Sequence, residues 1–260
     1  SLRRTASFSA AGVSYRLSRH TSLGLTGSYA LQNYSDYGNV WAGPLINNRV
    51  VTGNTYLSRQ VSRRYVLGVG YRVRRLTFSG YDMPTLTQSL LSFHQFDITA
   101  NTSFVVYAGP EYARTRSQTF AFRNASASWS PAAGAIYSWS GMHNSLQAGV
   151  SRNVNDGGGL QGPVWLNAGW LRVGRQLTRR WAADLGAELA QQTALAAPSG
   201  DRLRILRGGA GFRRELGRNA SLRFSYERLY QTGGSPLYRP GNHNRVALSI
   251  EHSFMRPLGR

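Results

Sequence analysis

The sequence of 260 residues predicts an all-β protein with one antiparallel, up-and-down sheet, on three observations. Apolar residues alternate with small or polar ones at a period of two, which is the side-chain period of a β-strand. Short connections alternate with longer ones rich in Gly, Pro, Asn, Asp and Ser. Most stretches between connections have about 10–15 residues, whereas strands of soluble proteins usually have about 5–6. A tilted strand that crosses a bilayer needs about 9–11 residues, so together the observations predict a transmembrane β-barrel.

Four stretches show the alternation most clearly. In 23–32, leucine and tyrosine alternate with small or polar residues, and in 67–74 leucine, valine and tyrosine alternate with glycine and arginine. In 126–139, alanine, proline and aromatic residues alternate with a face dominated by serine. In 246–254, Val, Leu, Ile and Phe alternate with Ala, Ser, Glu and Ser. A helical period fits none of these stretches, so each is expected to be a strand.

The connections divide the chain into about 13 strands. Short connections are expected near 18–21, 62–64, 100–103, 141–144, 178–180 and 217–219, and longer ones near 35–47, 80–88, 117–124, 155–163, 195–202 and 233–243. Bacterial barrels have short periplasmic turns, long outer loops and an even number of strands. The first and last strands would run in the same direction, which gives an odd number. We therefore expect a further strand, either before Ser1 or hidden in residues 1–10, and closure at 14 or more strands. We expect a single barrel domain over 1–260, with a short tail at 255–260.

A repeated stretch supports assembly from hairpins. RQVSRRYVLGVGYRVRRL (59–76) and RQLTRRWAADLGAELAQQ (175–192) share Arg-Gln, an aliphatic residue, Ser or Thr, Arg-Arg and an aromatic residue in the same order. Each reads as a descending strand, a tight turn and an ascending strand. The repeat therefore indicates architecture rather than chemistry.

The overall composition excludes several alternatives. The sequence has no cysteine, so it can build neither a disulfide framework nor a thiolate metal site. No stretch approaches 18 consecutive apolar residues, which excludes a transmembrane helix. The mean hydropathy of −0.35 is compatible with a membrane barrel, because alternating strands average out as hydrophilic.

The formal net charge is +20, and all 31 basic residues are arginine. A GC-rich coding bias would explain the use of arginine in place of lysine without any functional role. The functional interpretation is that arginine binds phosphate and carboxylate bidentately. That chemistry suits a lipopolysaccharide surface or an anion pathway. A nucleic-acid-binding β protein would place arginine and aromatic residues on one face. Here the arginines lie at turns and on the small-residue face and the aromatics on the aliphatic face, so we predict no nucleic-acid partner.

Barrel geometry assigns the polar side of each strand to the lumen. The residues that we predict to line it are Arg16, Arg72, Arg74, Arg172, Asp184, Glu188, Arg207, Arg213, Arg223, Glu227 and Glu251. One interpretation is a water-filled pore that prefers anions, since fixed positive charge lowers the barrier for anions. The other is a salt-bridge network that fills and closes the barrel. Small inward residues such as Gly24, Gly68 and Ser128 leave space that charges alone would not fill.

Aromatic residues on the apolar side fall near the two ends of the predicted strands. Those expected in membrane girdles are Tyr65, Trp129, Trp139, Trp181, Tyr230 and Phe254. Two such girdles anchor a barrel at the headgroup levels of the bilayer. A soluble protein would instead have to bury these side chains in an ordinary core.

The end of the sequence resembles that of bacterial outer-membrane β-barrel proteins. VALSIEHSF (246–254) alternates apolar residues and ends on an aromatic one, like the C-terminal signal that the barrel-assembly machinery reads in this class. The residues that match the signal are Val246, Leu248, Ile250 and Phe254. A six-residue tail follows Phe254 here, whereas most members end on the aromatic residue. The resemblance implies a Gram-negative outer membrane, with lipids, lipopolysaccharide and the assembly machinery as partners; the oligomeric state stays open.

Catalytic and metal sites are not indicated. The five histidines are scattered without metal-ligand spacing, and the proximity of Ser92 and His94 in sequence means little without an orienting carboxylate in space. We expect no enzyme and no cofactor. The predicted function is an outer-membrane pore for passive diffusion of small hydrophilic solutes, with a preference for anions. The alternatives are a specialised barrel for polysaccharide export and a closed structural or adhesive barrel.

Overall fold

The computed structural model describes residues 2–36, 47–78, 84–119, 122–155, 163–195, 202–217, 219–233 and 241–252. They form thirteen strands, and no helix among them is long and apolar enough to cross a membrane. The strands are β1 (Leu2–Arg16), β2 (Thr21–Asp36), β3 (Asn48–Ser62), β4 (Tyr65–Phe78), β5 (Thr85–Thr99), β6 (Thr102–Thr119), β7 (Phe122–Ser140), β8 (Asn144–Asn155), β9 (Val164–Gln176), β10 (Trp181–Ala194), β11 (Arg202–Glu215), β12 (Ala220–Gly233) and β13 (Gly241–His252).

Each strand pairs with its neighbours in the chain, in one antiparallel sheet ordered β1 to β13. This confirms the predicted all-β, up-and-down fold. Residues 2–16 form one continuous strand, so the extra strand considered for residues 1–10 is not there. In the described ladders β1 pairs only with β2, and β13 only with β12. The sheet is therefore open along these two edges.

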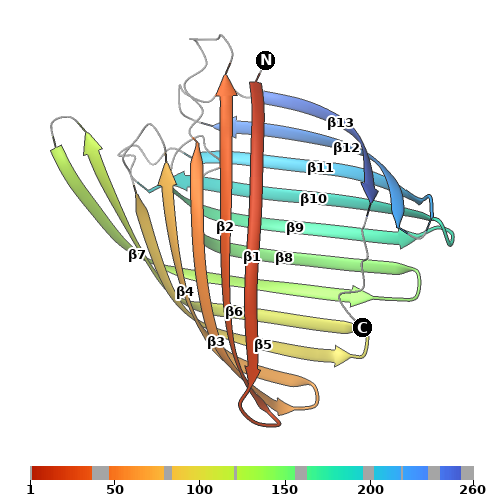
Figure 1. Ribbon diagram of the computed structural model, residues 1–260, viewed down its shortest axis with the longest axis horizontal. Helices are drawn as coiled ribbons and strands as arrows, with labels where there is room; N and C mark the ends of the chain where they lie inside the picture. The colour runs from red at the N-terminus through yellow and green to blue at the C-terminus, as the bar shows by residue number, and fades with distance from the viewer. Residues whose placement is uncertain are drawn as a thin grey trace, which may run out of the picture.

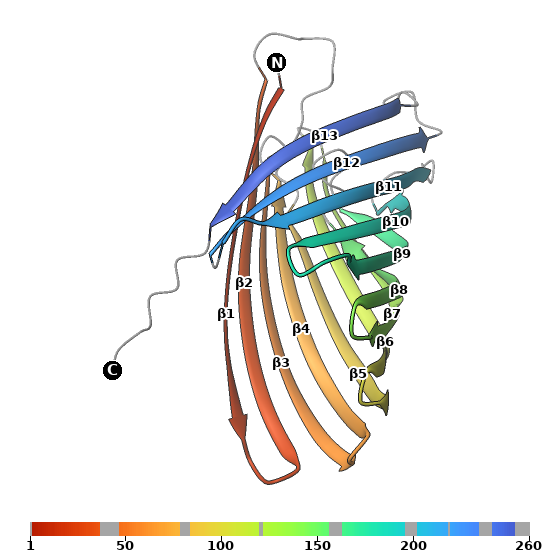
Figure 2. The same cartoon turned by 90° about the vertical axis from the view of Figure 1, so that its right-hand side faces the viewer.

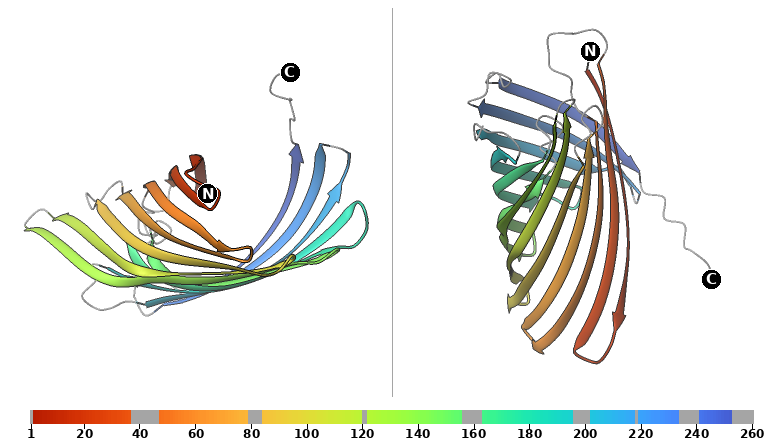
Figure 3. Two further views of the ribbon diagram at one scale, coloured as in Figure 1. Left: turned by 90° about the horizontal axis from the view of Figure 1, so that it is seen from below. Right: turned by 90° about the vertical axis from the view of Figure 1, so that its left-hand side faces the viewer.

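The sheet is strongly twisted and curved. Strand direction turns steadily along the sheet, so that β1–β4 cross the direction of β10–β13 at a wide angle (Figures 1 and 2). Neighbouring strands in any sheet are rotated by roughly 20–25°, and this rotation accumulates over many strands. Seen from below, the sheet forms a trough with a concave and a convex side (Figure 3).

Contacts between strands that are not neighbours identify the concave side. Arg74 of β4 and Glu111 of β6 both bond to the backbone of Val154 in β8. Such contacts require side chains that point into the trough. Directly opposite residues of an antiparallel pair point to the same face, so the pairing register extends this assignment to every strand. We call this side the inward face and the convex side the outward face.

The outward face is apolar and exposed. Leu25, Val69, Leu185 and Leu248 belong to it, and each has a large exposed area. Burial of such a side chain is worth about 1.5–3 kcal/mol, so a long exposed row of them is unfavourable in water. Lipid chains would cover the same surface in a bilayer, as the outward band of a membrane barrel requires.

Candidate functional site: the charged inward face

All eleven residues predicted to line a lumen lie on the inward face. The register places them there strand by strand: Arg16, Arg72, Arg74, Arg172, Asp184, Glu188, Arg207, Arg213, Arg223, Glu227 and Glu251. Strand alternation alone was therefore enough to group them. That they line an open pore stays a prediction.

Among the side chains that the structure describes, four more charged ones share this face and were not among the predicted residues. They are Asp97, Glu111, Glu215 and Arg245. Alternation along the strand assigns all four to this face. Pro110 next to Glu111 and the register shift after Asp97 make the alternation harder to recognise at these two residues. With these additions, the inward strand side chains that the structure describes comprise eight arginines and seven carboxylates. The face is close to charge balance, which weakens the argument for anion preference.

A charged hollow of about 830 Å³ lies on the inward side of β9–β13. Its charged lining consists of Arg172, Asp184, Glu188, Arg207, Arg223, Glu227 and Arg245. The volume falls within the range of about 300–1,000 Å³ that is usual for small-molecule pockets. We call this hollow the charged groove.

Ion pairs run along the wall of the charged groove. Arg223 binds Asp184 at 3.2 Å, and Arg207 binds Glu227 at 3.2 Å and Glu188 at 3.5 Å. The side chains in these pairs are 39–48% exposed, so solvent screens the attraction and each pair contributes only about 0–1 kcal/mol. The pairs join side chains of β10, β11 and β12 along the lining of the charged groove.

A second polar network crosses β2–β4. Arg72 donates from Nε to Oδ1 of Asn54 at 2.9 Å, and Asn54 donates from Nδ2 to Oγ1 of Thr26 at 3.1 Å. The three residues stand in one row of the ladder, because Thr26 is opposite Asn54 and Asn54 is opposite Arg72. The inward face is therefore hydrogen-bonded along its wall in both halves.

Several glycines on this face do not leave the free space that the sequence suggested. The ring of Tyr56 covers Gly24, and the ring of Phe93 covers Gly68 so closely that a Cβ atom would collide with it. Tyr107 covers Gly134 in the same way, and Trp170 lies 2.7 Å from a Cβ atom placed on Gly149. Inward aromatic rings thus lie along the wall over a neighbouring glycine. This arrangement packs the wall and is invisible in a single-strand pattern.

Near the long connections β8 leaves β7, and side chains of β4 and β6 reach the end of β8. Ladder pairing between these strands ends at Ala133 and Arg152, so the backbone of Val154 loses its β7 partner. The N–H of Val154 donates instead to Oε2 of Glu111 at 2.9 Å, and its carbonyl accepts from the Arg74 guanidinium at 2.7 Å. Glu111 is only 2% exposed. Side chains of β4 and β6 thereby hold the end of β8 across the trough.

An apolar cluster surrounds this connection. Leu76, Phe78, Ala113 and Val154 are buried together, and Val50, Trp165 and Leu195 pack against them. In the pairing register Leu76, Phe78 and Ala113 point inward, whereas Val154 and Trp165 belong to the outward side of β8 and β9. The ends of β8 and β9 therefore lie against the inward face of β4–β6. We call the cluster, together with Glu111 and Arg74, the constriction.

Three amide side chains near the long connections have open hydrogen-bonding capacity. Both polar atoms of Asn48, Oδ1 of Asn153 and Oε1 of Gln192 are buried without a partner in the part of the chain that the structure describes. An unpaired buried polar atom costs about 1–3 kcal/mol. Such atoms are normally satisfied by water or a bound polar molecule.

The predicted girdle aromatics lie on the outward face. This holds for Tyr65, Trp129, Trp139, Trp181 and Tyr230, and the guanidinium of Arg214 covers the Trp181 ring at 5.2 Å. Trp129 is 71% exposed, as expected for a side chain that reaches the membrane interface.

The predicted assembly signal is described in part. Val246, Leu248 and Ile250 point outward on β13, and all three are exposed. Phe254 and the tail at 255–260 lie outside the described residues.

Ser92 and His94 do contact each other, on the outward face. Ser92 Oγ lies 3.2 Å from Nε2 of His94, and Nδ1 of His94 bonds to the Tyr65 hydroxyl at 2.8 Å. A phenol therefore occupies the position that an orienting carboxylate takes in a catalytic triad. No group of three potential metal ligands occurs among the residues described.

Similar solved structures are outer-membrane β-barrels. No protein-family model matches the chain, and no curated protein matches it in sequence. The copper transporter OprC has a TM-score of 0.55 at 11% identity, over 95% of this chain and 52% of that one. The FrpB iron transporter of Neisseria meningitidis also scores 0.55 at 11% identity, over 89% and 44%. The alcaligin outer-membrane receptor FauA of Bordetella pertussis scores 0.54 at 11% identity, over 99% and 52%.

These similarities confirm the predicted fold. The chain spans about half the length of the structures it matches. The sheet of thirteen strands thus corresponds to part of a larger barrel in each of them.

Proposed function

We propose that this chain forms the wall of an outer-membrane transport barrel, and that small hydrophilic solutes pass along its inward face. The charged groove carries the proposal, because it joins a solute-sized volume to seven charged side chains that remain partly exposed. The names of the similar structures, which include transporters of copper and iron, support transport as the general activity.

The constriction would set the size limit of the pathway. There the apolar cluster packs strands of the two halves of the sheet together. The unpaired amide atoms of Asn48, Asn153 and Gln192 lie on strands that contribute to it or adjoin it. A polar solute that reaches it could satisfy these atoms in place of water. Passive diffusion past the constriction is the simplest mechanism that these residues support.

Charge selectivity should be weak. The near balance of eight arginines and seven carboxylates on the described inward face gives only a slight excess of fixed positive charge. A ring of one sign would be needed for strong selection between ions. We therefore expect a small preference for anions.

The test is single-channel recording of the purified full-length protein in a planar bilayer, with the reversal potential measured under a salt gradient. The proposal predicts steady current steps and a reversal potential near zero, displaced slightly in the anion direction. The variant Arg72→Glu should move the reversal potential towards cations, and Arg59→Glu, an outward control near a short turn, should not. A folded, inserted protein that conducts no current would instead support the closed barrel.

Size exclusion distinguishes the polysaccharide alternative. Proteoliposome swelling with neutral sugars of increasing length should show a sharp cutoff at short oligomers if the constriction limits passage. Passage of long polysaccharide chains at a comparable rate would favour export of polysaccharide over general diffusion.

A further inference from the structure

Among the strand residues whose side chains the structure describes, most outward arginines lie at one end of the sheet. Eight of them lie in the halves of the strands next to the long connections, and all eight are exposed: Arg49, Arg75, Arg114, Arg116, Arg152, Arg202, Arg204 and Arg228. The seven strand carboxylates whose side chains the structure describes all point inward. Among the strand side chains that the structure describes, the outward face therefore presents cations without a compensating carboxylate.

This segregation points to an anionic molecule outside the protein. Arginine matches phosphate with two parallel hydrogen bonds, and it is weakly hydrated compared with an ammonium group. Outward residues face lipid, and in an outer-membrane barrel the long connections face the outer leaflet. The anion expected at this depth is therefore a lipid headgroup.

The register aligns two of these arginines in one row. Arg152 of β8 is opposite Asn167, Asn167 is opposite Gln191, and Gln191 is opposite Arg204 of β11. Strands are about 4.8 Å apart, so three spacings place the two arginines roughly 14 Å from each other. The two amides between them can bond to sugar hydroxyls as donors and as acceptors. We call these four residues the polar row.

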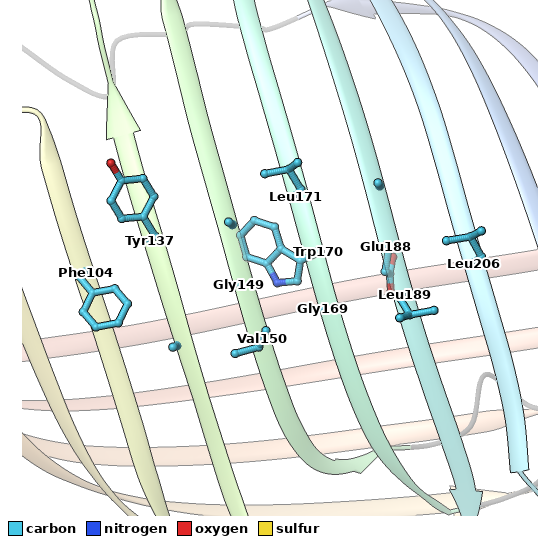
Figure 4. A pocket seen from close by; sticks show the side chains of 13 residues that line it. Phe104, Tyr137, Gly149, Val150, Gly169, Trp170, Leu171, Glu188, Leu189 and Leu206 are labelled. Carbon is cyan, nitrogen blue, oxygen red and sulfur yellow. The ribbon is translucent and has the colours of Figure 1, made fainter.

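An apolar groove of about 500 Å³ adjoins the polar row (Figure 4). Val150, Gly169, Leu189 and Leu206 line it, and each lies two positions along its strand from one member of the polar row. In Figure 4 the side chains of Val150, Leu171, Leu189 and Leu206 lie around Gly169, where the glycine leaves the surface hollow. A Cβ atom on Gly169 would meet nothing closer than 3.8 Å.

We infer that this part of the outward face binds a phosphorylated, acylated glycolipid of the lipopolysaccharide class. Its phosphates bind Arg152 and Arg204, its sugar contacts Asn167 and Gln191, and one acyl chain lies in the groove. Charge complementarity and the junction of a cationic row with an apolar groove select this occupant over a second copy of the chain. A second copy would bring its own arginines to the same place, and they would repel.

The inference is tested with the full-length protein in phosphatidylcholine nanodiscs, using lipid A and phosphatidylglycerol as probes. Native mass spectrometry or co-purification gives the amount of each lipid retained. The wild type should retain lipid A at a stoichiometric level and prefer it to phosphatidylglycerol. The double variant Arg152→Gln, Arg204→Gln should bind lipid A roughly tenfold or more weakly, since a charge-assisted hydrogen bond is lost at each site. The matched control Arg59→Gln, Arg175→Gln removes two outward arginines near the short turns and should bind like the wild type.

A second variant tests the groove separately from the charges. Gly169→Val fills the hollow and should lower retention of lipid A while leaving the binding of its deacylated, phosphorylated sugar unchanged. Gly27→Val, an outward glycine on β2 with similar free space, is the control. Because these variants leave the polar row intact, they still decide the question if the arginine variant does not fold.

Three results would overturn the inference. Retention of phosphatidylglycerol as tight as that of lipid A would mean a general anionic attraction. Equal loss in the two double-arginine variants would show that position at the outer end is irrelevant. Dimers that disappear on Gly169→Val, without any change in lipid A binding, would assign the groove to a second copy. None of these outcomes depends on solute transport through the inward face.

Discussion

The charged groove and the constriction use the same residue types under opposite conditions. In the charged groove, Asp184 and Arg223 form an ion pair whose side chains are nearly half exposed. In the constriction, Glu111 is buried and accepts the N–H of Val154, whose carbonyl is bonded to Arg74. Solvent can replace the partner of Asp184 but not that of Glu111. Burial, and not the presence of an ion pair, therefore decides which charged residues hold this sheet together.

The largest effect is expected at the constriction. Glu111→Ala leaves the Val154 N–H without its partner and removes a carboxylate that interacts electrostatically with Arg74. We expect a loss of about 2–4 kcal/mol in the free energy of unfolding, since a buried group left unpaired bears its full desolvation cost. Urea unfolding in lipid vesicles would measure it. A loss below about 1 kcal/mol would contradict the assignment of Glu111 as a structural tie.

An intermediate effect is expected where an inward ring covers a glycine. Gly68→Ala forces the added methyl group into the Phe93 ring, and overpacking of this kind costs about 1–3 kcal/mol. Gly70→Ala, two residues along the same face of β4, meets no atom closer than 3.5 Å and should be nearly neutral. The double variant Gly68→Ala, Phe93→Leu should regain part of the loss. Equal losses at both glycines would mean that β-strand propensity, and not the ring, determines the effect.

The smallest effect is expected in the charged groove. Asp184→Asn breaks the pair with Arg223, but solvent screens both groups, so unfolding should change by less than about 1 kcal/mol. The same urea experiment at low and high salt would show any residual effect shrinking with salt. A loss as large as that of Glu111→Ala would place this wall among the main stabilising elements and remove the contrast between the two regions.

The sequence was sufficient for the fold because alternation is local. Strand length, turn asymmetry and a period of two identified thirteen strands, and they grouped residues as distant as Arg16 and Glu251 on one face. The constriction was not predictable in this way. Glu111, Arg74 and Val154 meet because β8 separates from β7, and neither the separation nor the contact leaves a periodic signal in the chain.

The glycines show the same limit. A glycine on the polar side of a strand suggests open space, but Gly24 and Gly68 are covered by rings from the next strand. Only the register between strands reveals that pairing. The polar row is a similar case. Arg152 and Arg204 are far apart in the sequence, and only the ladders of β8–β11 place them in one row of the sheet.

The most direct test of the central claim uses the absence of cysteine from this chain. Ser225 lies on the inward face of β12 in the lining of the charged groove, whereas Leu248 lies on the outward face of β13. Single-channel current would be recorded for Ser225→Cys and Leu248→Cys before and after a charged thiol reagent is added from the aqueous side. We expect a stepwise fall in current for Ser225→Cys and no change for Leu248→Cys. An unchanged current in a Ser225→Cys protein that has reacted fully would contradict the assignment of the inward face as the transport path.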